Sequence, residues 1–201
     1  MLSLRKPSQA SVHRFLTRQA RLDFSYSAVG TVGHASPTGF VVDHTRVKLG
    51  SGEHVFQAAR MALRSWEHFQ LGWVESSSRD IPIAVGEVVG VMARVFGVWS
   101  LNACRIVGVI DEPGDTDRYG FAYGTLPGHV ESGEERFQVE WNRKDNSVWY
   151  DILAFSRPHH VLARIGYPVV RKLQKRFARD SAAAMQLAVK NISSHQGSKL
   201  S

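Results

Sequence analysis

The sequence predicts an α+β fold: a strongly bent antiparallel sheet of about seven strands wrapped around a long C-terminal helix, with short helices near the N-terminus. Three observations support this. Val-rich and alternating segments separated by turn residues fill residues 86–155. A stripe of apolar residues at helical spacing follows, from Leu162 to Ala188. A bent sheet and a helix can bury these apolar faces against each other. A closed barrel with a peripheral helix is the alternative.

Length and composition indicate one domain, which we expect to span residues 1–190, with 191–201 as a flexible polar tail. Apolar residues make up 43% of the 201, enough for a core, and no apolar run approaches the ~18 residues of a membrane span. The single cysteine excludes a disulfide framework and a cysteine-based zinc cage. It fits a reducing compartment, so we expect a cytoplasmic protein.

The N-terminal third contains two predicted helices and one predicted strand. Residues 1–22 hold five basic residues and no acid, which is typical either of an amphipathic helix capped by Ser8 or of an organellar transit peptide. Phe24 to Val32 is rich in aromatic and β-branched residues and predicts a strand. A turn region follows at 33–39, and Ser51 or Gly52 begins a helix that runs to about Trp66.

The central segments predict consecutive strands. Residues 86–99 and 103–110 are Val-rich without a helical period, and Cys104 within them is expected to be a small buried apolar residue. In residues 119–126 large and small side chains alternate, so one face is lined by Gly and Ala. Because small residues allow close approach, we expect an apolar cavity of roughly 300 Å³ or more between the sheet and the last helix.

A hairpin is predicted between residues 136–141, which alternate strictly, and residues 148–155. A two-residue turn at Asp145-Asn146 would place Trp141 opposite Tyr150 and gather the apolar residues on one face. The same register sets Glu140 opposite Asp151, which is unfavourable, and a longer turn is the alternative.

The last helix is predicted to begin near Ser156, as its cap, with Pro158 in the first turn. Pro168 then falls inside the helix, where it should remove one hydrogen bond and produce a kink. From Arg157 to Arg179 the segment carries seven basic residues and no acid. This stripe is either a solvated outer face or a surface for nucleic acid or an anionic membrane.

The long run from Tyr119 to Phe137 (YGFAYGTLPGHVESGEERF) resembles the signature of the DUF1990 family, also called UPF0548. Residues 154–158 (AFSRP), 168–177, 5–8 (RKPS) and 24–30 (FSYSAVG) are similar to its other motifs. The resemblance implies that the N-terminal segment belongs to the domain, which disfavours the transit peptide. It also implies the Bet v 1/START-like helix-grip fold, whose members bind apolar ligands or catalyse reactions. That link carries little functional weight by itself.

The most reactive constellation is the acidic loop at residues 128–135. It combines His129 with Glu131, Glu134 and Glu135, a set that can shuttle protons. The alternative is that the segment is only a hairpin connection and its side chains have no chemical role. If the loop is only structural, His129 should bond to backbone. A metal site is not predicted, because zinc prefers more histidines than the loop offers.

Aromatic residues with polar tips concentrate in the strands that should face the last helix. They suit a wall that grips an amphipathic ligand, although a packed core needs them equally. The predicted ligand-binding residues are Tyr119, Tyr123, Trp141, Tyr150, Arg157 and Pro168.

We therefore expect a protein that binds a small apolar or amphipathic ligand between sheet and helix, without a cofactor. An enzyme using the same cavity, with His129 and Glu131 or Glu135 as acid and base, is the alternative. A second alternative is an anionic membrane surface or, less favoured, nucleic acid bound by the basic helix.

Overall fold

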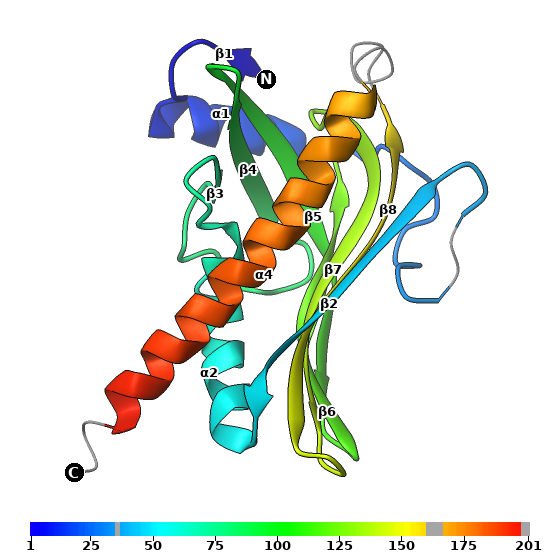
Figure 1. Cartoon of the computed structure of the whole chain (residues 1–201). Helices are drawn as coiled ribbons and strands as arrows, with labels where there is room; N and C mark the ends of the chain where they lie inside the picture. Colours follow the sequence, from blue (N-terminus) through cyan, green and yellow to red (C-terminus); the bar gives the residue numbers. More distant parts are fainter. Residues whose placement is uncertain (35–36, 160–166, 198–201) are drawn as a thin grey trace.

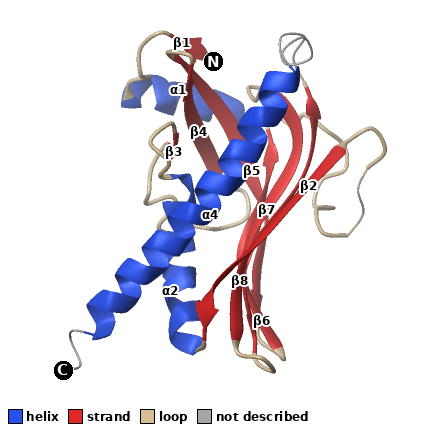
Figure 2. Ribbon diagram, viewed as in Figure 1, coloured by secondary structure: helices blue, strands red, loops and turns tan. Residues whose placement is uncertain are grey.

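The computed structural model describes residues 1–34, 37–159 and 167–197. Seven strands form one antiparallel sheet that curls around the long helix α4 (Tyr167–Gly197), as Figures 1 and 2 show. The strand order is β2 (Val41–Ser51), β8 (Ser147–Pro158), β7 (Glu131–Asn142), β6 (Thr116–Thr125), β5 (Val98–Glu112), β4 (Val88–Val95) and β3 (Val74–Ser76). The predicted fold class is therefore confirmed, and the short strand β1 (Leu2–Ser3) adds one further pairing to β5.

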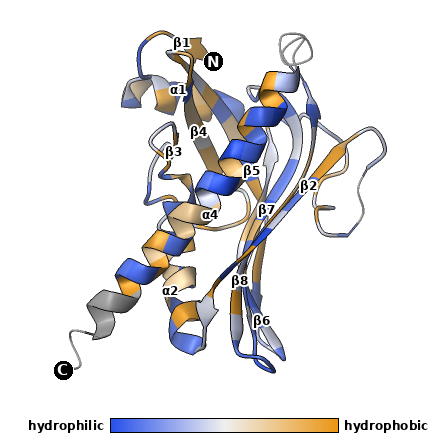
Figure 3. Cartoon of the chain, viewed as in Figure 1, coloured by the Kyte–Doolittle hydropathy of each residue, from blue (hydrophilic) through white to orange (hydrophobic). Residues whose placement is uncertain are grey.

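The main core lies on the concave side of the sheet. There α2 (Glu53–Arg64), the short 3₁₀ helix η1 (Glu67–Phe69) and α4 pack over inward-facing side chains of the strands. Ala182, Met185 and Val189 are the buried apolar residues in the described part of α4, and they fall at helical spacing. Figure 3 shows the same division, with the upper turns of α4 hydrophilic and its middle turns more hydrophobic.

The N-terminal helix is confirmed as α1 (Gln9–Gln19). The Ser8 hydroxyl caps it by accepting a hydrogen bond from the Ser11 amide, and Val12 and Phe15 pack on the outer side of β4 and β5. No helix among the described residues is both long enough and apolar enough to cross a membrane.

The strand predicted at residues 24–32 is wrong. These residues have no strand pairing and cross the convex face of the sheet as an irregular segment, where Tyr26 packs against Ala122 and Phe155. The first long strand is instead Val41–Ser51, which pairs with β8 at the edge of the sheet. An edge strand that exposes one face has a weaker apolar pattern, and Phe24–Val32 carries aromatic residues because it covers the sheet.

The small-residue face of β6 is the convex one, opposite the cavity predicted from it. A Cβ atom at Gly124 would overlap the Tyr26 hydroxyl, and one at Gly120 would overlap the Phe137 carbonyl oxygen. Other atoms therefore do come close to the small residues of β6, but these atoms belong to Tyr26 and Phe137 of the same chain and not to a ligand.

The hairpin register differs from the predicted one by two residues. Trp141 lies opposite Val148 and Val139 opposite Tyr150, because the turn is longer and includes Asn146 at a φ of 59°. A shift of two keeps every apolar residue on its face. It also places Glu140 opposite Trp149, which avoids the carboxylate pair of the shorter turn.

The start of the last helix was predicted too early. Ser156 and Pro158 belong to the end of β8, and α4 begins at Tyr167, so Leu162 and Ile165 lie outside the described residues. Pro168 is the second residue of the helix as described, and in a first turn a missing N–H removes no intrahelical hydrogen bond. The helix continues to Gly197, well past the predicted start of the tail.

Candidate ligand cavity

A cavity of about 240 Å³ lies between the concave face of the sheet and the first three turns of α4. It is smaller than the cavity predicted. Its apolar wall comes from η1 and the segment after it, from β4 and β8, and from α4, with Phe69, Trp73, Val74, Val91, Ile152, Leu173 and Phe177 as its main side chains. Aromatic contacts stiffen this wall, since the ring of Phe69 lies 5.3 Å from that of Phe177 and 6.2 Å from that of Tyr123.

One end of the cavity is polar, and strand alternation explains why. Glu131 and Glu135 occupy alternating positions of β7 that share a face with Phe137, a residue of the main core. The Tyr123 hydroxyl, from the facing position of β6, donates to Glu135 Oε2 at 2.8 Å. Gln174 of α4 donates through Nε2 to Glu131 Oε1 at 2.6 Å. Sheet and helix therefore each supply one donor to a carboxylate.

Both carboxyl groups are perturbed. Burial raises the pKa of Glu131 to about 7, although the hydrogen bond from Gln174 opposes the shift. Burial likewise raises the pKa of Glu135 to about 7, against the hydrogen bond from Tyr123. Near neutral pH each group exchanges its proton readily, which is the property that acid–base chemistry or recognition of a cation requires.

His129 lies at the rim of the cavity and bonds to backbone, the outcome expected of a structural histidine. Its Nδ1 accepts a hydrogen bond from the Glu131 amide at 3.0 Å, and no carboxylate within the described residues contacts the ring. Burial lowers the pKa of His129 to about 4, so the ring is neutral at physiological pH. The predicted pairing of His129 with a glutamate side chain as acid and base is absent from this arrangement.

Glu134 points to the opposite face from Glu131 and Glu135. Its carboxylate accepts hydrogen bonds from the Tyr26 hydroxyl at 2.6 Å, the Val32 amide at 2.9 Å and the Gly30 amide. These contacts bind the irregular segment 24–32 to the convex side of the sheet. Glu134 is therefore a structural residue, although it lies within the acidic loop of the sequence.

Of the six predicted ligand-binding residues, Tyr123 lines the cavity and the others lie elsewhere. Tyr119 accepts a hydrogen bond from Arg64, Trp141 packs on Phe56, and Tyr150 bonds to Ser181 beneath α4. Arg157 is exposed beside the ring of Phe40, and Pro168 is exposed on the first turn of α4. The aromatic concentration seen in the sequence therefore serves the core more than the cavity. Cys104 is fully buried, as predicted.

Several polar residues of the cavity wall were not predicted, among them Gln174, Asn102 and Asp43. Asn102 is 6% exposed on β5, and its Oδ1 has no hydrogen-bond partner among the described residues. A polar residue at an inward position of a Val-rich strand is the signal that could have identified it. Asp43 of β2 forms an ion pair with Arg171 of α4, at 2.6 Å between Oδ1 and NH2. No strand had been predicted at Asp43, so its inward position could not be inferred.

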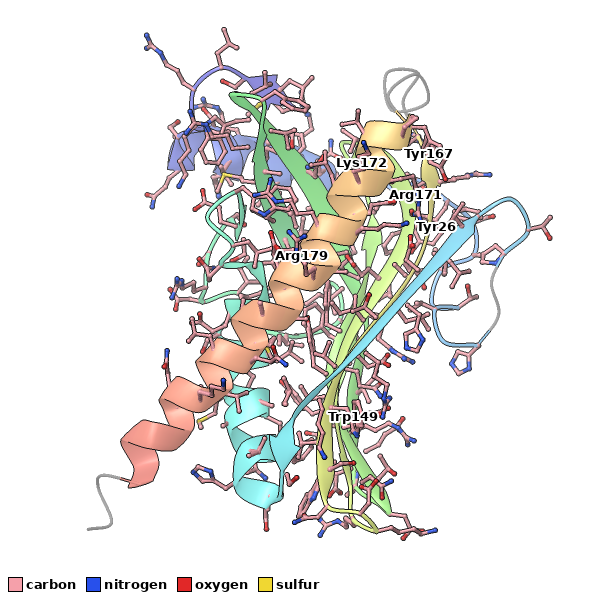
Figure 4. The ribbon with its side chains drawn as sticks, viewed as in Figure 1. Tyr26, Trp149, Tyr167, Arg171, Lys172 and Arg179 are labelled. Carbon is pink, nitrogen blue, oxygen red and sulfur yellow. The ribbon has the colours of Figure 1, made fainter. Side chains whose placement is uncertain are left out.

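The basic stripe on α4 is partly neutralised. Arg171 is engaged by Asp43, and Arg176 and Arg179 both contact Asp180. In Figure 4 Lys172 and Arg179 lie on the other side of α4 from Arg171, and neither of them lines the cavity.

The raised pKa of Glu135 predicts a pH-dependent effect of Glu135→Gln. The folded state favours the protonated carboxyl, so stability is lost as pH rises from about 4.5, the ordinary value, to about 7. The amide avoids that cost and still accepts from Tyr123. We expect the variant to match the wild type at pH 4.5 and to exceed it by about 2 kcal/mol at pH 8, after allowance for partial exposure. Urea unfolding at both pH values measures this, and an equal difference at both would contradict the assignment.

Comparisons with known proteins agree with the fold. A family model described as a domain of unknown function, DUF1990, matches residues 25–184. A UPF0548 protein of Dictyostelium discoideum is 38% identical over 209 residues, covering 94% of this chain and 96% of that protein. One from Deinococcus radiodurans is 36% identical over 194 residues, covering 90% and 96%. The crystal structure of human STARD10 matches with a TM-score of 0.50 at 11% identity, covering 98% of this chain and 85% of that one. At this identity the match shows the fold alone.

Proposed function

The chain belongs to the DUF1990 (UPF0548) family, and on that premise we propose that it binds one small amphipathic ligand in the cavity between the sheet and α4. The observation that supports this proposal is the division of the cavity into an apolar, aromatic wall and a polar end formed by Glu131, Glu135 and Gln174. Pockets that orient a ligand combine a mostly apolar lining with a few convergent polar groups.

The size of the cavity limits the ligand. About 240 Å³ lies below the range of ~300–1,000 Å³ typical of drug-sized ligands, so the ligand is small. The inner end is closed by the packed rings of Phe69 and Phe177, which favours a compact apolar body over a long acyl chain.

An enzyme acting on the same ligand is the second candidate. The pKa of about 7 at Glu135 favours it, because a general base works best when its pKa lies near the operating pH. In that case Glu135 would carry the chemistry, since His129 is occupied by backbone. Both candidate functions require a small ligand to bind in the cavity, so ligand binding is tested first.

Filling the cavity tests the proposal. Ala154 shares the inward face of β8 with Ile152 and lines the cavity, so Ala154→Leu should occupy part of the space. Ala10→Leu, on the exposed side of α1, is the matched control. In an NMR titration with 2-phenylethanol, we expect saturable shifts at residues 152–156 and 173–178 in the wild type and the control, and at least a tenfold weaker response in Ala154→Leu. Shifts that are scattered over the surface, or that persist in Ala154→Leu, would contradict the proposal.

A further inference from the structure

The polar end of the cavity offers hydrogen-bond acceptors, and its two carboxyl groups have no direct ion pair among the described residues. Glu131 uses Oε1 for Gln174, and Glu135 uses Oε2 for Tyr123, which leaves the second oxygen of each carboxylate for another donor. Among the described residues no Lys or Arg forms an ion pair with either glutamate. The nearest candidate, Arg171, is engaged by Asp43 and donates to Gln174 Oε1 at 2.6 Å.

Asn102 supplies an independent observation in the same cavity wall. Its amide nitrogen faces the Val91 carbonyl oxygen at 3.4 Å. A carbonyl can only accept, so the side-chain oxygen must be the atom left over, and that Oδ1 is buried without a partner. An unsatisfied buried acceptor costs ~1–3 kcal/mol, so this part of the cavity wall lacks a hydrogen-bond donor.

The apolar wall is suited to the same kind of ligand. Phe69, Trp73, Tyr123 and Phe177 contribute four aromatic rings to the lining. Ring faces attract cations, and this attraction strengthens where water is excluded. An acceptor-only polar end beside an aromatic wall therefore selects a donor-bearing cation with an apolar body and rejects an anion.

We propose that the ligand of this cavity is a small apolar amine, bound as its ammonium ion with its N–H groups directed to the free carboxylate oxygens of Glu131 and Glu135. This inference rests on the proposed function and names its ligand class. The apolar body of the amine lies among the aromatic rings.

Charge at the polar end sets the pH dependence of binding. The titratable or charged groups that interact with the two glutamates are Tyr123 on β6, Cys104 on β5, Tyr150 on β8, Asp43 on β2 and Arg171 on α4. His129, which also lines the cavity, is neutral at physiological pH. Glu131 and Glu135, each with a pKa of about 7, change charge between pH 6 and 8. An alkylammonium stays charged up to a pH of ~10, so its affinity should rise across this interval as the carboxyls ionise.

The test compares three probes of nearly equal shape and different charge: 2-phenylethylamine, 2-phenylethanol and phenylacetate. At pH 8 we expect the amine to bind at least tenfold more tightly than the alcohol, with shifts at residues 152–156 and 173–178, and phenylacetate to give no saturable shift there. Glu135→Gln should weaken amine binding about tenfold and leave alcohol binding within twofold. Glu87→Gln removes an equal charge at an exposed site and should change neither affinity.

The outcomes separate the two proposals. If the alcohol or phenylacetate binds in the cavity as tightly as the amine, the ammonium assignment is overturned and ligand binding stands. If Glu135→Gln and Glu87→Gln weaken the amine equally, the effect is one of overall charge, and the contact with Glu135 is refuted. If none of the three probes changes the chemical shifts of the cavity residues, both the proposed function and the assignment of an amine ligand are refuted.

Discussion

Replacing Glu134 by Ala is expected to lower the free energy of unfolding by about 3–5 kcal/mol, because three hydrogen-bond donors lose their acceptor at a cost of ~1–3 kcal/mol for each one that stays buried. The side chain is 2% exposed and accepts from the Tyr26 hydroxyl and from the amides of Gly30 and Val32. Truncation leaves three donors under the segment 24–32 without an acceptor. Since that segment has no strand pairing of its own, it should detach from the sheet.

Urea unfolding measures the loss of stability, and hydrogen exchange at the Gly30 and Val32 amides locates it. Glu135→Gln is the comparison variant, because it changes the adjacent residue on the other face of β7 and should stabilise the protein at pH 8. A loss below ~1 kcal/mol in Glu134→Ala, or protection of the two amides equal to the wild type, would show that the segment is held by its aromatic contacts instead.

His68→Leu is expected to stabilise the protein, increasingly so in acid. The His68 ring is fully buried, stacked on Trp66 and 4.7 Å from the ring of Phe137, and neither nitrogen has a hydrogen-bond partner among the described residues. Burial lowers its pKa to about 3. Removing two unsatisfied polar atoms should outweigh the lost ring contacts and raise the free energy of unfolding by about 1 kcal/mol at pH 7.

The pH dependence follows from the lowered pKa. The unfolded chain takes up a proton on His68 below about pH 6.5 while the folded chain does not, so stability is present above pH 6.5 and lost as pH falls toward 3. At pH 5 this amounts to about 2 kcal/mol, so the advantage of His68→Leu should reach about 3 kcal/mol. His54→Leu, at an exposed position of α2, is the control. An advantage that does not grow between pH 7 and pH 5 would contradict the assignment.

The candidate site shows where sequence reasoning reached its limit. Alternation in β7 puts Glu131 and Glu135 on one face and Glu134 on the other, but this follows only if residues 131–135 are a strand and not a loop. The loop assignment therefore grouped three glutamates that the structure separates. Asp43 was missed because no strand had been predicted there. Asn102 was missed although a polar residue at an inward position of a Val-rich strand is a detectable signal.

The sequence was enough to predict the family resemblance, the helices near Gln9–Gln19 and Glu53–Arg64, and an antiparallel sheet packed with a long C-terminal helix. It did not predict β1, β2 or β3, and the strand predicted at 86–99 is divided between β4 and β5. Periodicity and turn chemistry are local, and they report which face of each element is apolar. The tertiary structure alone decided that residues 24–32 cover the sheet, that α4 begins at Tyr167, and that Glu135, Gln174 and Asn102 share a cavity. Those outcomes depend on contacts between residues far apart in the chain, where packing overrides local preference.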